Sequence, residues 1–83
     1  MANGSYFVVM PFDRDQNGTL VAGDSQNVDN AFVALRLAEA MAFVPGRAGA
    51  IAFSRTSDQD TGEFQQPEVI AEYGYTDISA LPA

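Results

Sequence analysis

Hydrophobic positions near the start of the chain predict a β-hairpin. Residues 6–12 are mostly aromatic or β-branched and apolar on both alternating faces, which is typical of a strand buried on both sides. Pro11 predicts a sheet edge or a strand end nearby, because proline cannot donate a hydrogen bond to a sheet ladder. Asn17-Gly18 is a turn signal, and residues 19–22 are expected to return as a second strand.

The middle of the chain predicts one helix, over residues 28–44. Asn27 or Ser25 is expected to cap its start, Asp29 to lie in its first turn, and Pro45-Gly46 to end it. At about 100° per residue, the alanines of this segment form one stripe with leucine and methionine beside it, so the helix can lie close to a sheet. The stripe and its flanks consist of Ala31, Ala34, Leu35, Leu37, Ala38, Met41 and Ala42.

The last third of the chain predicts two more strands. Residues 49–56 alternate in a strand pattern, and residues 57–63 form a polar turn. Residues 68–75 favour a final strand, because apolar side chains recur there at every second position. Pro67 and Gly74 would equally frame a short helix, so this alternative stays open.

Together these elements predict an α+β fold. The order is strand, strand, helix, strand, strand, with a small antiparallel or mixed sheet of three or four strands and the helix packed on one face. At 83 residues the chain has room for one compact domain, residues 1–83. Residues 76–83 show no periodicity and are expected to form a loose C-terminal tail, with a strand or a short helix as the alternatives.

Composition narrows the chemistry that this domain can carry. The chain has no cysteine, histidine or lysine, which excludes zinc and iron–sulfur sites, thiol nucleophiles, Ser-His-Asp triads and P-loops. Any metal site must therefore be built from oxygen ligands. Apart from such a metal ion no cofactor is expected, and the protein is not expected to be an enzyme, because no catalytic constellation is visible.

The net charge and the hydropathy of the chain limit the classes of partner that we expect. Eleven acidic residues against four basic ones give a formal charge of −7, which repels the phosphates of nucleic acids. No segment reaches the roughly 18 uncharged apolar residues of a membrane span, because Arg36 and Glu39 interrupt the best candidate. The first residues lack the basic stretch and apolar core of a signal peptide. We therefore expect a cytoplasmic protein without nucleic-acid or membrane partners.

The acidic turn after the first strand fits the spacing of a twelve-residue calcium loop, from position 13 to position 24. The candidate ligands are Asp13, Asp15, Asn17, the carbonyl of Thr19, and Asp24. Gly18 stands sixth, where such a loop turns sharply so that alternate side chains converge on one cation. The turn resembles an EF-hand loop but has Asp24 in place of the bidentate glutamate and a strand before it. A plain hairpin turn selects the same residues, so Ca²⁺ binding is the alternative function.

The predicted helix is apolar over more of its circumference than one sheet face can cover. Phe32, Val33 and Phe43 share the half opposite the alanine stripe with the polar residues Asp29, Arg36 and Glu39. Surplus apolar surface of this kind predicts that something else packs over it. The candidates are the C-terminal tail, a second copy of the helix and a different protein. We therefore expect a small acidic accessory domain that acts by protein interaction, with Phe32, Val33 and Phe43 at a partner or homodimer interface.

Four segments resemble small uncharacterised bacterial proteins. They are the Phe-Asp-Arg-Asp turn at 12–15, the Leu-Ala-rich helix at 35–42, the Gly-Ala-Ile-Ala-Phe-Ser-Arg-Thr strand at 49–56, and Asp-Thr-Gly-Glu-Phe at 60–64. The resemblance spans most of the chain and implies a bacterial source. It implies no activity, ligand or catalytic residue.

Overall fold

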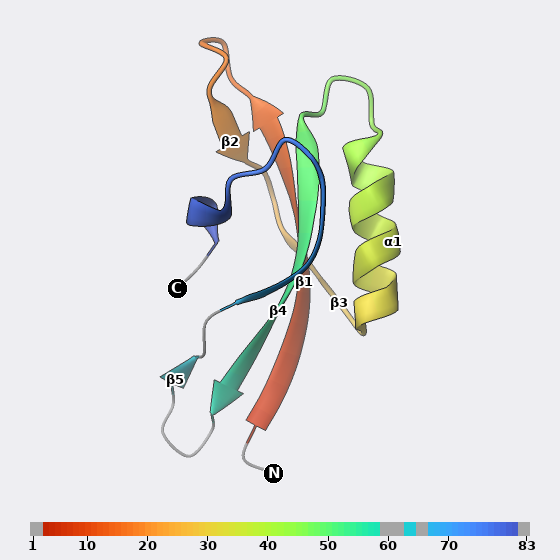
Figure 1. Ribbon diagram of the computed structural model, residues 1–83, viewed down its shortest axis with the longest axis vertical. Helices are drawn as coiled ribbons and strands as arrows, with labels where there is room; N and C mark the ends of the chain where they lie inside the picture. Colours follow the sequence, from red (N-terminus) through yellow and green to blue (C-terminus); the bar gives the residue numbers. More distant parts are fainter. Residues whose placement is uncertain (1–2, 59–62, 65–66, 82–83) are drawn as a thin grey trace.

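Two long antiparallel strands form the centre of the structure, a computed structural model that describes residues 3–58, 63–64 and 67–81 (Figure 1). β1 (Asn3–Arg14) and β4 (Gly49–Asp58) pair along their length. Two short strands, β2 (Leu20–Ala22) and β3 (Gln26–Val28), pair one after the other with the outer edge of β1. β5 (Glu63–Phe64) and β6 (Glu68–Gly74) do the same along β4, and all these pairings are antiparallel.

The predicted α+β class and element order are confirmed, with more strands than expected. The helix α1 (Ala31–Ala42) packs on one face of the sheet and connects β3 to β4 (Figure 1). β3 and β4 run parallel to each other with β1 between them, because each is antiparallel to β1. The sheet therefore has four positions across its width, of which the two outer ones are each divided into two short strands.

The predicted hairpin between the first two strands is confirmed. Arg14 pairs with Leu20 across the turn 15–19, and Gly18 adopts the φ of 80° that this turn requires. Of the predicted polar turn 57–63, residues 57–58 extend β4 and residue 63 begins β5. Residues 59–62 lie outside the described residues.

β1 continues through Pro11, which pairs with Ala50 of β4, and the expected strand end follows nearby at Arg14. The Pro11 carbonyl accepts a hydrogen bond from the Gly23 N–H at 2.8 Å, and the Phe12 carbonyl accepts one from the Ala48 N–H at 2.9 Å. The N–H and C=O of one strand residue point to the same edge, so the N–H that Pro11 lacks would face the gap between β2 and β3. The proline therefore removes no hydrogen bond between β1 and β4.

The start of the helix differs from the prediction. Asn30 is the N-cap, and its side-chain oxygen accepts a hydrogen bond from the Val33 N–H at 2.9 Å. Neither Asn27 nor Ser25 caps the helix, and Asp29 precedes the first turn instead of lying in it. An apolar periodicity alone does not locate this boundary, since the cap is set by which side chain reaches a free N–H.

Strand pairing explains why the helix is shorter than predicted. Residues 26–28 pair with Val9, Val8 and Phe7 of β1, which withdraws them from the helix. At the other end α1 stops at Ala42, and the predicted stop at Pro45-Gly46 follows as a turn in which Gly46 has a φ of 86°.

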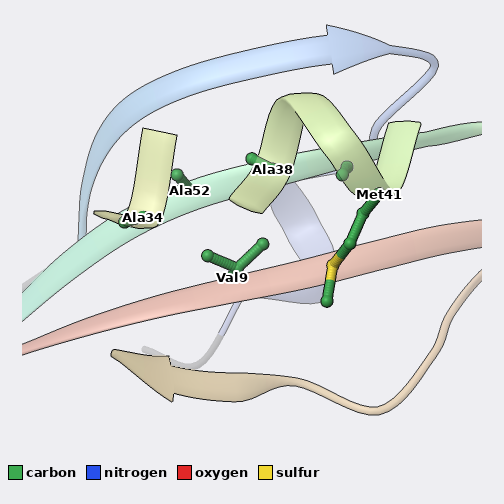
Figure 2. Packing of buried hydrophobic residues seen from close by; sticks show 6 residues of the cluster. Val9, Ala34, Ala38, Met41 and Ala52 are labelled. Carbon is green, nitrogen blue, oxygen red and sulfur yellow. The ribbon is translucent and has the colours of Figure 1, made fainter. Parts of the chain in front are cut away.

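Small residues make up the core between the helix and the sheet. The buried residues of this side are Val9, Ala34, Ala38, Met41, Ala50 and Ala52. In Figure 2, Val9 points from β1 toward the helix and Met41 extends from the helix toward β1. Alanines on both surfaces let α1 lie close to the strands, as the predicted stripe implies. Ala31, the first residue of that stripe, is exposed.

Large residues make up the core of the opposite sheet face. Phe12, Ile51 and Phe53 are buried there, with Val8, Met10, Leu20 and Leu81 packed against them. Ile51 and Phe53 alternate with the alanines of β4, so they lie on the face without the helix. Leu81 belongs to the segment expected to be a loose tail. In the structure Ile78–Ala80 form a 3₁₀ turn, η1, on the far side of the strands from α1 (Figure 1).

Of the segment 68–75, residues 68–74 form the strand β6, and the alternative short helix is not found there. Ala52 of β4 pairs with Ala71 of β6, but the next residue of β4, Phe53, pairs with Val69. This shift in register marks a β-bulge in β6. Ile70 therefore packs on the helix side of the sheet, whereas Val69 shares the other face with Phe53. The predicted alternation of apolar residues is interrupted at this point.

Candidate interaction surface

The three predicted interface residues lie on the side of α1 that faces away from the sheet. Phe32 is 69% exposed, Val33 is 41% exposed and Phe43 is 77% exposed. The elements that pack against α1 are β1, β3, β4 and β6, and the residues buried on the helix are Ala34, Ala38 and Met41. In Figure 1 no other described segment lies beyond α1 on its outer side.

Val44 extends this apolar surface beyond the end of the helix, a contribution that the sequence reasoning missed. It is 46% exposed, and its N–H donates to the Met41 carbonyl at 3.2 Å, which holds the residue against the last helical turn. The available signal is that an apolar pair, Phe43-Val44, directly precedes the turn residues Pro45-Gly46. A chain leaving a helix through such a turn has no sheet beneath it to cover that pair.

Two charged residues lie between the exposed phenylalanines. Phe32, Arg36, Glu39 and Phe43 follow one another at spacings of four, three and four residues, which places them on one line along the helix. We call these four residues the outer stripe. The guanidinium carbon of Arg36 lies over the Phe32 ring, 5.9 Å from its centre. The outer stripe therefore has an aromatic ring at each end and one positive and one negative charge at its centre.

Two of the residues predicted to bind calcium already have partners in the structure. Asp13 Oδ1 accepts a hydrogen bond from Arg47 Nε at 3.1 Å, an ion pair that joins the end of β1 to the loop after α1. Asp15 Oδ1 accepts hydrogen bonds from the N–H groups of Asn17 and Thr19, each at 2.9 Å. These two bonds stabilise the hairpin turn.

Asp24 and Asp13 line one polar hollow of about 390 Å³ together with Arg47. The remaining lining residues are Pro11, Gly23, Gln26 and Met41. Across the described parts of the chain, no group of three or more acidic side chains is close enough to hold a metal ion. The positive charge of Arg47 also opposes a cation in this hollow. Calcium binding by the loop 13–24 stays a prediction.

A second hollow, on the sheet face without the helix, was not predicted. It measures about 290 Å³ and is lined by Tyr6, Val8, Met10, Ser25, Asn27, Phe53 and Arg55. Its walls are mainly apolar because alternate side chains of β1 and β4 point to this face. The alternation of Tyr6, Val8 and Met10 is visible in the sequence, but it does not reveal that the sheet face is hollowed at these residues.

Comparisons with known proteins supply no relative from which a function could be transferred. The chain matches no protein family, no curated protein and no solved structure. The resemblance to small bacterial proteins therefore stays a prediction. Within the described ranges, no helix is both long enough and apolar enough to cross a membrane.

Proposed function

We propose that this chain is a cytoplasmic protein-interaction domain that acts by binding and not by catalysis, through the outer side of α1. The observation that supports the proposal is the exposure of Phe32 and Phe43, at 69% and 77%. Phe32 lies on α1 and Phe43 is its C-cap, and the inner side of the helix already packs on the sheet through Ala34, Ala38 and Met41.

The free energy available at this surface is substantial. Covering an exposed phenylalanine contributes about 2 kcal/mol relative to leaving it in water. The fold of the monomer does not use this contribution, because neither ring belongs to the two core clusters of the described residues. A partner that covers both rings, with Val33 and Val44 beside them, gains it on binding.

The first partner to consider is a second copy of the chain. Of the three covers that the sequence suggests, the C-terminal tail lies on the other sheet face as far as the structure describes it, since Leu81 packs against Phe12, Ile51 and Phe53 there. Most soluble oligomers are homo-oligomers, and two-fold dimers are the commonest among them.

Sedimentation equilibrium of the wild-type chain at up to about 0.5 mM, well above the micromolar Kd of ordinary weak complexes, tests the proposal. We expect a monomer–dimer equilibrium that Phe32→Ser and Phe43→Ser each weaken. Val33→Ser and Val21→Ser are a matched pair, because both valines are 41% exposed but Val21 lies on β2. Only the change on α1 should weaken association. A wild-type chain that stays monomeric would contradict the homodimeric form of the proposal, and a dimer that tolerates both phenylalanine changes would contradict the proposed surface.

A further inference from the structure

The outer stripe has the spacing of a helix–helix contact. Steps of four, three and four residues repeat every seven residues, which is the pattern of the core positions of a coiled coil. On such a stripe each residue lies opposite a residue of the neighbouring helix. The stripe runs from Phe32 on α1 to Phe43, the C-cap of this helix of 12 residues, which gives a contact about 18 Å long at 1.5 Å per residue.

The stripe is also symmetric in chemistry. Its midpoint lies between Leu37 and Ala38, with Arg36 and Glu39 equally far from it and Phe32 and Phe43 equally far beyond them. Reversing the direction of the helix exchanges phenylalanine for phenylalanine and arginine for glutamate. This is the arrangement that an interface with two-fold symmetry requires, because each residue then meets the residue with which it is exchanged.

We propose that a second copy of the chain packs its α1 antiparallel against the first, about a two-fold axis at this midpoint. Phe32 then contacts Phe43 of the partner subunit, and Arg36 pairs with Glu39 of the partner subunit, each contact occurring twice. This inference rests on the proposed function and adds the partner, the direction of the helices and the register.

Charge decides between the antiparallel and the parallel arrangement. In a parallel pair in register, Arg36 would face Arg36 of the partner subunit, and Glu39 would face Glu39 of the partner subunit. Like charges across a contact are unfavourable, whereas the antiparallel arrangement makes two opposite-charge pairs. Arg36 stacks over Phe32 at 5.9 Å, so its charge is held on the stripe where these pairs form. The rings provide most of the affinity, and the charges select the orientation.

A contact of this length is small for a permanent interface. Interfaces that bury little area belong to weak, reversible complexes. We therefore expect a Kd of roughly 10–500 µM, a range in which the chain is monomeric when dilute and dimeric when concentrated.

Exchange of charges between two variants tests the register directly. Arg36→Glu places glutamate against glutamate in a homodimer, and Glu39→Arg places arginine against arginine. Each variant alone should dimerise about tenfold more weakly than wild type, since two attractive pairs become repulsive. In an equimolar mixture every central contact of the heterodimer is again between opposite charges. The mixture, and the double variant R36E/E39R alone, should therefore recover wild-type affinity.

Two variants elsewhere on the molecule control for the change in overall charge. Arg14→Glu and Asp24→Arg change the net charge by the same amounts but lie in the β1–β2 hairpin and in the loop after β2. Their homodimers should match wild type, and mixing them should change nothing. Far-UV circular dichroism confirms that each variant is folded.

The outcomes separate this inference from the proposed function. A wild-type dimer that needs Phe32 and Phe43, but whose two charge variants do not complement each other on mixing, overturns the antiparallel register and leaves the interaction surface in place. Charge variants that each dimerise like wild type overturn the register as well. A wild-type chain that stays monomeric at about 0.5 mM overturns this inference together with the homodimeric form of the proposed function, and leaves only a different protein as the partner of the surface.

Discussion

Gly49 of β4 and Gly74 of β6 lie opposite one another in the sheet, and neither position has room for a side chain. A Cβ atom at Gly49 would overlap the backbone of Tyr73 and Tyr75, and one at Gly74 would overlap the Ala48 carbonyl. Gly74 also has a φ of 71°, at which the chain turns away toward η1.

Gly49→Ala should therefore destabilise the domain strongly. The atoms that meet the new methyl group belong to the backbone, which cannot move aside as a flexible side chain does, so we expect a loss of about 3 kcal/mol. Gly46→Ala is the control, since Gly46 has a positive φ but open space around it, and should cost about 1 kcal/mol. Urea unfolding followed by circular dichroism measures both, and equal losses would contradict the close approach of β4 and β6.

The close packing of α1 on the sheet predicts a second result. Ala38 is 0% exposed within the alanine layer, so Ala38→Leu should push the helix from the sheet and cost about 2 kcal/mol. Ala40 lies on the same helix but is exposed, and Ala40→Leu should change the unfolding free energy by less than about 0.5 kcal/mol at low protein concentration. If both leucines are tolerated alike, the layer between helix and sheet is looser than the structure indicates.

The position of the helix cap gives a third prediction. Asn30→Ala removes the side-chain oxygen that accepts the Val33 N–H, and should lower the unfolding free energy by about 1 kcal/mol. Asn27 is an exposed residue of β3, so Asn27→Ala should have a smaller effect. Thermal unfolding of the two variants side by side measures the difference, and a larger loss for Asn27→Ala would place the start of the helix where the sequence alone suggested it.

The hairpin turn gives a fourth prediction, on calcium. Asp13 is paired with Arg47, and Asp15 is hydrogen-bonded within the turn. We therefore expect no saturable change in the amide shifts of residues 13–24 below about 1 mM Ca²⁺, with Mg²⁺ as the reference cation. Arg47→Ala removes the positive charge that competes for Asp13 and should raise the affinity of this loop for Ca²⁺. Arg14→Ala, at the base of the turn, should raise this affinity less. Saturation of the wild-type chain at micromolar Ca²⁺ would instead support the calcium loop.

An element of this fold is predictable from the sequence when burial of its apolar side chains determines where it forms. The helix and the central strands are of this kind, so their apolar periodicity predicts them. β3 has the sequence Gln-Asn-Val and no apolar alternation, so only its backbone pairing with β1 defines it, and that pairing is invisible in the sequence. The same pairing moved the helix start from residue 28 to Ala31.

The candidate site likewise has one part that the sequence predicts and one part that it does not. The exposure of Phe32, Val33 and Phe43 follows from the helical wheel once one side is assigned to the sheet. The ion pair between Asp13 and Arg47 joins residues that are 34 positions apart, and no local pattern predicts such a contact. For that reason the acidic turn by itself suggested a cation site, whereas in the folded chain one of its carboxylates faces an arginine.

The division of both outer positions of the sheet into short strands also affects aggregation. An edge that is long, flat and unpaired offers a template on which other chains can add strands. On the side of β1 the edge is broken between β2 and β3, and on the other side β6 has a bulge at Ile70 and exposed glutamates at 68 and 72. These interruptions and charges oppose edge-to-edge growth of fibrils, so a chain that is 47% hydrophobic can bring copies together at a helix while its strands stay protected.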